Sequence, residues 1–121
     1  MQPFRAAVEA GDIEAAIALL ADDVVFHSPV AFTPYRGRDA VGLVLRAVFQ
    51  VFRDFRYVRE IGAAGGSDHA LVFRALVGER EIEGCDFLHL GPDGVIEELT
   101  VMVRPLNAAL ALAETMKARL S

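Results

Sequence analysis

Apolar and polar residues alternate along the second half of the chain, which is the pattern of β-strands with one buried face. The clearest stretch runs from Glu83 to Pro105, where two apolar runs flank the turn sequence Gly91-Pro92-Asp93-Gly94. Because proline presets φ and glycine accepts a positive φ, this stretch predicts a β-hairpin. Two more strands are expected at 55–61 and 69–77, joined to the hairpin through short turns.

The first part of the chain instead repeats apolar residues at spacings of three and four, which predicts amphipathic helices. Residues 3–10 form the first expected helix, and Gly11 ends it. An aspartate, a typical N-cap residue, opens a second expected helix over 12–21. A short strand is then expected at 24–28, where Pro29 stops it.

Residues 38–53 predict a longer helix, whose polar stripe leaves a wide apolar face suited to lying across a sheet. Pro105 opens a last helix with a moderate apolar stripe. The element order is therefore helix, helix, strand, helix, four consecutive strands and a helical tail. Short turns between consecutive strands give an antiparallel sheet, so the predicted fold class is α+β, with three helices closing a curled sheet around a cavity.

The chain has 121 residues and is expected to form one domain over 1–121, since 54% of its residues are hydrophobic and suffice for a full core. A net charge of -5 argues against a nucleic-acid surface, which needs clustered Lys and Arg. No apolar run approaches the roughly 20 residues of a membrane span, and the N-terminus lacks a signal pattern. The lone Cys85 forms no internal disulfide, so the cytoplasm is the expected compartment.

One carboxylate, Asp86, interrupts the apolar row of the predicted hairpin. In a regular strand it shares a face with Ile82, Gly84 and Leu88. Burial there disfavours the charged form and raises the pKa, so Asp86 is the expected catalytic acid or base. The alternative is a structural carboxyl that is satisfied by Tyr57, a backbone amide or an arginine.

His27 and Ser28 end the first predicted strand, and as neighbours they point to opposite faces. They therefore do not form a nucleophile and base pair, and only one of them faces the cavity. Alternation with Phe26 favours Ser28, but the register near Pro29 leaves the choice open. His27 is the second candidate for a catalytic residue.

Three motifs accompany this order of elements. They are Gly11-Asp12 followed by Leu19-Leu20-Ala21-Asp22-Asp23-Val24-Val25-Phe26-His27-Ser28-Pro29, then Gly37-Arg38-Asp39-Ala40-Val41, and then Gly84-Cys85-Asp86 through Arg104-Pro105. Together they resemble the nuclear transport factor 2-like superfamily, specifically its SnoaL-like polyketide cyclase and ketosteroid isomerase branch. The resemblance spans about the whole chain. It implies a cone-shaped, curved, mostly antiparallel sheet wrapped around three N-terminal helices, with an added C-terminal helix.

Carried over by position, the resemblance implies one catalytic residue in common. Asp86 matches the carboxylic acid that ketosteroid isomerases keep protonated in apolar surroundings. Ser28 stands where that branch has its carboxylate base, and Phe4 where it has a tyrosine donor. A hydroxyl does not abstract a carbon-bound proton unaided, so ketosteroid isomerisation by that route is not expected. A histidine is frequent at this motif in SnoaL-like relatives, which favours His27 as the ligand-facing residue.

The expected cavity wall is mainly apolar and aromatic. A tyrosine in such a wall could orient a ligand oxygen, although a core aromatic is the alternative for Tyr57. The residues expected to contact a substrate are Phe4, Phe26, Ser28, Tyr57, Phe73, Leu99 and Val101.

The spacing of candidate ligand residues in the sequence argues against a metal site or a cofactor site. Cys85 and His89 share a strand face but lie roughly 13 Å apart at four residues' rise, too far for a common ion. The Gly62–Gly66 cluster links two strands and does not open a helix, as a nucleotide-binding loop would. We therefore expect neither a metal nor a cofactor.

The expected function is cofactor-independent acid–base chemistry, of isomerase, cyclase or hydrolase type, on a small apolar oxygenated substrate. The alternatives are a non-catalytic ligand-binding or accessory domain and an interaction module with a vestigial pocket. The same fold hosts all of these, so the resemblance does not decide whether the protein is an enzyme.

The outer surface of the predicted sheet carries apolar residues on neighbouring strands, and a monomer rarely exposes that much apolar area. The resemblance implies sheet-mediated dimers, so we expect a homodimer with two-fold symmetry. Its contacts are expected from Val72, Arg74, Leu76, Ile96, Thr100 and Met102.

Overall fold

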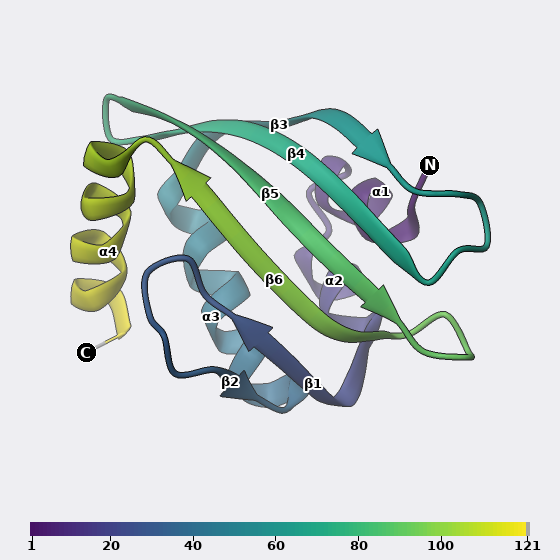
Figure 1. The fold of residues 1–121 in the computed structure, drawn as a ribbon. Helices are drawn as coiled ribbons and strands as arrows, with labels where there is room; N and C mark the ends of the chain where they lie inside the picture. The colour runs from purple at the N-terminus through teal and green to yellow at the C-terminus, as the bar shows by residue number, and fades with distance from the viewer. Residues whose placement is uncertain (121) are drawn as a thin grey trace.

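The structure is a computed structural model that describes residues 1–120. Within them, four helices and six strands follow one another along the chain (Figure 1). Their bounds are α1 Pro3–Glu9, α2 Ile13–Ala18, β1 Leu20–His27, β2 Tyr35–Arg36, α3 Arg38–Val51, β3 Phe52–Ile61, β4 Asp68–Val77, β5 Arg80–Leu90, β6 Ile96–Arg104 and α4 Leu106–Leu120. None of the described helices has both the length and the apolar character needed to cross a membrane.

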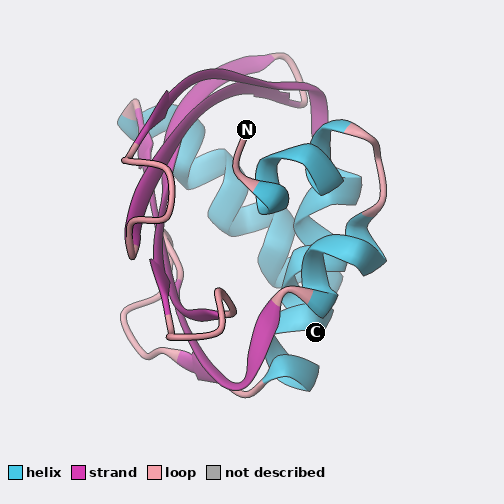
Figure 2. Ribbon diagram, turned by 90° about the vertical axis from the view of Figure 1, so that its right-hand side faces the viewer, coloured by secondary structure: helices cyan, strands magenta, loops and turns pink. Residues whose placement is uncertain are grey.

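The six strands form one curved sheet in the order β2-β1-β6-β5-β4-β3. All neighbouring strands pair antiparallel except β1 and β6, which are parallel and far apart in sequence. The sheet bends around α1, α2 and α3, and α4 contacts α3 and one end of the sheet (Figure 2). This arrangement confirms the predicted α+β class and the cone-shaped sheet.

Side-chain caps determine where the two short helices begin. The Gln2 side chain accepts the amide hydrogen of Phe4 at 2.6 Å, and the Asp12 carboxylate accepts that of Ala15 at 3.0 Å. Each cap satisfies an amide that has no partner inside its helix. The first cap also fixes the direction of α1, whose Phe4 side chain is buried in the core.

The boundary between α2 and β1 lies earlier than the sequence pattern predicts. α2 ends at Ala18 and β1 begins at Leu20, whereas the pattern predicts a longer helix and a strand from Val24. The strand begins early because this part of the chain pairs with β6. Leu20 lies beside Ile96, and the Ile96 amide donates to the Leu19 carbonyl at 2.9 Å. The pattern also does not predict β2. This strand has only two residues, and they are a strand because they pair with β1.

Ile96 is buried at 1% exposure, so its expected place on the outer surface of the sheet is wrong. The register of β5 and β6 shifts near their connecting turn, where His89 pairs with Glu98 but Leu90 pairs with Ile96. The extra residue in β6 is a β-bulge, and it breaks the two-residue alternation. Ile96 and Leu99 are therefore both buried although an odd number of positions separates them.

Candidate active site

A cavity of about 60 Å³ lies between the concave face of the sheet and the helices α3 and α4. Its walls are mostly hydrocarbon side chains and phenyl rings. Pro29 and Val30, from the loop after β1, and Leu120, at the end of α4, border it where the chain is more exposed. The six residues of the sequence-predicted contact set that line it are Phe4, Phe26, Ser28, Phe73, Leu99 and Val101. Their roles toward a ligand stay predictions.

Asp86 lies on the buried face of β5, as the alternation predicts, and borders the cavity at 6% exposure. The hydroxyl of Tyr57, on β3, reaches across β4 and donates to Asp86 Oδ2 at 2.8 Å. The second carboxyl oxygen, Oδ1, has no hydrogen bond to any residue in the range 1–120. That oxygen is therefore the one left for a molecule in the cavity.

Burial controls the charge of this carboxyl. Desolvation raises the pKa of Asp86 from 3.8 to about 7, although the hydrogen bond from Tyr57 favours the carboxylate and acts in the opposite direction. Burial and the nearby carboxylate also raise the pKa of Tyr57, so its hydroxyl keeps its hydrogen and remains a donor. Near neutral pH the carboxyl therefore populates both its acid and its base form.

Two further polar groups border the cavity. Ser28 Oγ accepts a hydrogen bond from the Val30 amide at 3.2 Å, which leaves its own hydrogen available. Tyr35, from β2, contributes a second hydroxyl. Among the lining residues that the structure describes, Asp86 is the one carboxyl and there is no imidazole or amine.

The structure does not bring His27 to the cavity. Its ring is partly exposed, and Nε2 lies 3.7 Å from the Glu98 carboxylate on the neighbouring strand β6. Ser28 borders the cavity, so the open choice between the two adjacent residues is decided for Ser28. A catalytic role for His27 has no support in this geometry, because successive residues of a strand point to opposite faces.

Tyr57 was expected to contact substrate, but it does not line the cavity. It is buried at 6% exposure behind Asp86, and its ring packs edge-on against Phe55 at 5.0 Å. Tyr57 is thus a core aromatic, which was the alternative interpretation of this residue, and its hydroxyl satisfies one oxygen of the Asp86 carboxyl.

The sequence analysis missed an aromatic cluster beside the cavity, formed by Phe49, Phe52 and Phe55. The rings of Phe52 and Phe55 lie 5.6 Å apart, although three positions separate them on one strand. A register shift between Arg53 and Arg56 brings them together. The sequence contains no pattern that predicts this bulge. A regular strand with a two-residue period would place the two rings on opposite faces.

Fold and site together define a class of protein. Residues 1–99 match the model of the SnoaL-like domain family. The chain therefore belongs to the SnoaL-like family, within the fold class of nuclear transport factor 2-like proteins. No curated protein matches the chain.

Several solved structures share this fold. A bacterial protein with a cystatin-like fold from Silicibacter pomeroyi DSS-3 is 40% identical, with a TM-score of 0.91 over 99% of this chain and 86% of its own. A steroid delta-isomerase from Pseudomonas aeruginosa is 41% identical, with a TM-score of 0.89 over 95% and 84%. A SnoaL-like protein from Burkholderia thailandensis E264, at 19% identity and a TM-score of 0.69 over 85% and 90%, is similar in fold alone.

Replacing Asp86 by asparagine is expected to change how stability depends on pH. The folded protein favours the neutral carboxyl, because its pKa is about 7 against 3.8 for an ordinary aspartate. The wild type therefore loses stability relative to Asp86→Asn as the pH rises from about 4 to about 7, by up to roughly 4 kcal/mol. Urea unfolding of both proteins across this range measures the effect, and parallel pH profiles would contradict it.

Replacing Tyr57 by phenylalanine is expected to raise the pKa of Asp86 above about 7, because the variant lacks the hydrogen bond that favours the carboxylate. A carbon NMR titration of the Asp86 carboxyl measures this pKa. Tyr35→Phe is the matched control, since Tyr35 borders the cavity and does not donate to Asp86. An unchanged or lowered Asp86 pKa in Tyr57→Phe would show that the bond does not tune the carboxyl.

Proposed function

We propose that the protein is a cofactor-independent enzyme that performs acid–base chemistry of the isomerase type on a small, mostly apolar, oxygenated molecule. The proposal rests on Asp86, a buried carboxyl with one oxygen held by Tyr57 and the other free beside an apolar cavity. With a pKa of about 7, this carboxyl suits a group that accepts a proton and returns it.

In the proposed reaction, the Asp86 carboxylate accepts a proton from the carbon between a carbonyl group and an alkene. The electrons of that C–H bond move toward the carbonyl oxygen and form a dienolate, and the free hydrogen of the Ser28 hydroxyl stabilises the developing charge. The Asp86 carboxyl then returns the proton to the far alkene carbon. The double bond thereby moves into conjugation with the carbonyl, and no atom is gained or lost.

The cavity limits the size of the substrate. At about 60 Å³ it is smaller than an engineered protein cavity of roughly 150 Å³ that binds benzene. Only a few heavy atoms of a ligand fit beside Asp86, and a longer ligand would extend toward Val30 and Leu120. The name of the Pseudomonas aeruginosa relative, a steroid delta-isomerase, supports an isomerase type of reaction, whereas the cavity volume favours a ligand much smaller than a steroid.

A second candidate function is ligand binding without turnover. It is favoured by the composition of the described cavity wall, in which Asp86 is the one carboxyl and no imidazole or amine accompanies it. In this role the neutral carboxyl donates a hydrogen bond to a ligand oxygen, and the phenyl rings bury the rest of the ligand.

We also propose that the protein acts as a homodimer through the convex surface of the sheet. Val72, Cys85 and Met102 form an apolar row across β4, β5 and β6, and Phe87 extends it. Met102 is 60% exposed and Phe87 42% exposed.

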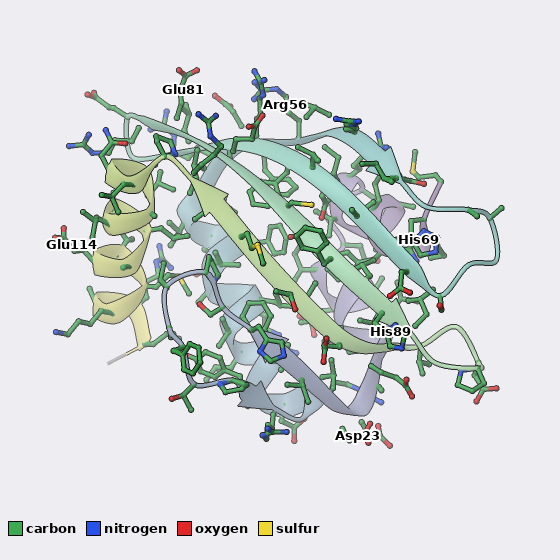
Figure 3. All side chains as sticks on the ribbon, in the orientation of Figure 1. Asp23, Arg56, His69, Glu81, His89 and Glu114 are labelled. Atoms are coloured by element: carbon green, nitrogen blue, oxygen red, sulfur yellow. The ribbon has the colours of Figure 1, made fainter. Side chains whose placement is uncertain are left out.

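Charged groups border this apolar row at both ends. Arg74 and Arg104 bind Glu83 at one end, and His89 binds Asp68 at the other. In Figure 3, the labelled Glu81 marks the first end and His89 the second. An apolar centre with a polar rim is typical of protein interfaces, which supports pairing of two copies here.

The cytoplasm is the proposed compartment. Cys85 is a free thiol and the chain has no second cysteine to pair with it, which suits a reducing environment.

Asp86→Asn is expected to lower the isomerisation rate of allyl methyl ketone, the smallest simple ketone that carries the proposed reaction, by roughly 10²- to 10⁴-fold. The conjugated product is followed by its ultraviolet absorbance. Asp93→Asn, at the exposed β5–β6 turn, is the matched control and should keep the wild-type rate. Undiminished turnover in Asp86→Asn would refute the role of this carboxyl, whereas binding of the ketone without any turnover in the wild type would favour the second candidate function.

Met102→Glu is expected to convert the dimer to a monomer, because it places a charge in the apolar row of each copy. Analytical ultracentrifugation measures the mass in solution. Leu110→Glu is the matched control, since Leu110 is similarly exposed, at 56%, but lies on α4 away from the row. A Met102→Glu protein with the same mass as the wild type would exclude this surface as the interface.

A further inference from the structure

Phe73 and Gly84 face each other across β4 and β5, and the tip of the Phe73 ring rests on the bare glycine. A Cβ atom added to Gly84 would lie 2.2 Å from Phe73 Cζ and 2.6 Å from Phe73 Cε2, which is far inside van der Waals contact. The backbone φ of Gly84 lies outside the left-handed region, so its conformation does not call for glycine. Glycine at this position therefore leaves room for the Phe73 ring, and an added Cβ would also come within 3.0 Å of the Met102 carbonyl oxygen on β6.

The ring has little freedom to move elsewhere. Phe55 stacks on it with a centroid distance of 4.9 Å, and the rings of Phe52 and Tyr57 lie at 5.6 Å and 6.4 Å. Phe73 also lines the cavity. Because protein interiors are densely packed, the cavity is the unfilled volume into which a displaced ring would move.

This contact lies next to the candidate catalytic carboxyl. Gly84 and Asp86 are two positions apart on the same buried face of β5, a separation of roughly 7 Å along the strand. A Phe73 ring pushed off Gly84 therefore takes up space beside Asp86. A smaller side chain in place of Phe73 would enlarge the same space.

We infer that the fit of Phe73 onto Gly84 determines how long a ligand can be when its carbonyl group lies beside Asp86. Gly84 and Phe73 are thus the specificity-determining pair of the cavity, which is matched to short aliphatic carbonyl compounds. The inference rests on the proposed function, since it concerns the ligand that Asp86 recognises.

A homologous series of methyl ketones tests this pair: acetone, ethyl methyl ketone, methyl propyl ketone and butyl methyl ketone. Each added methylene that becomes buried should strengthen binding roughly fourfold, and the gain should stop at the length that fills the cavity. NMR titration of the wild type, Gly84→Ala, Phe73→Leu and the double variant gives this limiting length for each protein. Gly91→Ala is the control, because the nearest atoms to its added methyl belong to the Glu97 side chain, which does not line the cavity.

The limiting length should be shorter than in the wild type for Gly84→Ala, longer for Phe73→Leu, and close to the wild type for the double variant and for Gly91→Ala. A purely structural role would weaken every ketone by the same factor and leave the limiting length unchanged. That result, or the same limiting length in all five proteins, would overturn the inference. If Phe73→Leu does not fold, the comparison of Gly84→Ala with Gly91→Ala decides alone.

Failure of the proposed function would have a different signature. If no ketone binds the wild type, the proposed ligand class is wrong, and xenon, which needs no hydrogen bond, then measures the cavity alone. Crystals under xenon pressure should show lower occupancy beside residue 86 in Gly84→Ala and higher occupancy in Phe73→Leu than in the wild type. Equal xenon occupancy in the three proteins would overturn the role of the pair.

Discussion

The structure depends on how it keeps one carboxyl group inside an apolar interior. A fully charged carboxylate without a partner is costly there, and an arginine beside it would fix the charge and remove its use in proton transfer. In this structure the carboxyl has a neutral partner in place of an arginine. Tyr57 donates one hydrogen bond to Asp86, and desolvation raises the pKa of the carboxyl to about 7. Two rigid strands hold the two residues, so the carboxyl is oriented before any ligand arrives.

The shape of the interior around that carboxyl follows from irregularities in the sheet. The register shift in β3, where Asp54 has a φ of 51°, brings Phe52 and Phe55 together, and the bulge in β6 buries both Ile96 and Leu99. Bulges bend a strand and increase its local twist, which helps the sheet to curl around the helices. The rings gathered in this way line the small cavity beside Asp86.

Regular parts of the chain could be predicted from the sequence, and irregular parts could not. The alternation in β5 correctly placed Asp86 on the buried face, because that strand keeps a two-residue period. Tyr57, which donates to Asp86, was one of the three partners proposed for a buried carboxyl at this position. The same rule failed for Ile96, where a bulge depends on pairing between strands. The choice between His27 and Ser28 also stayed open, because the sequence does not specify register at the end of a strand.

A single carboxyl in the described cavity wall bears on which acid–base reaction suits this site. Hydrolysis needs one group to activate water and another to protonate the leaving group, whereas a double-bond shift needs one group that takes a proton and returns it nearby. Asp86 has a pKa suited to both half-reactions, and Tyr57 can follow each change of charge without moving, since its hydroxyl donates to the carboxylate and to the neutral acid alike. Isomerisation is therefore the reaction type that we propose for this cavity.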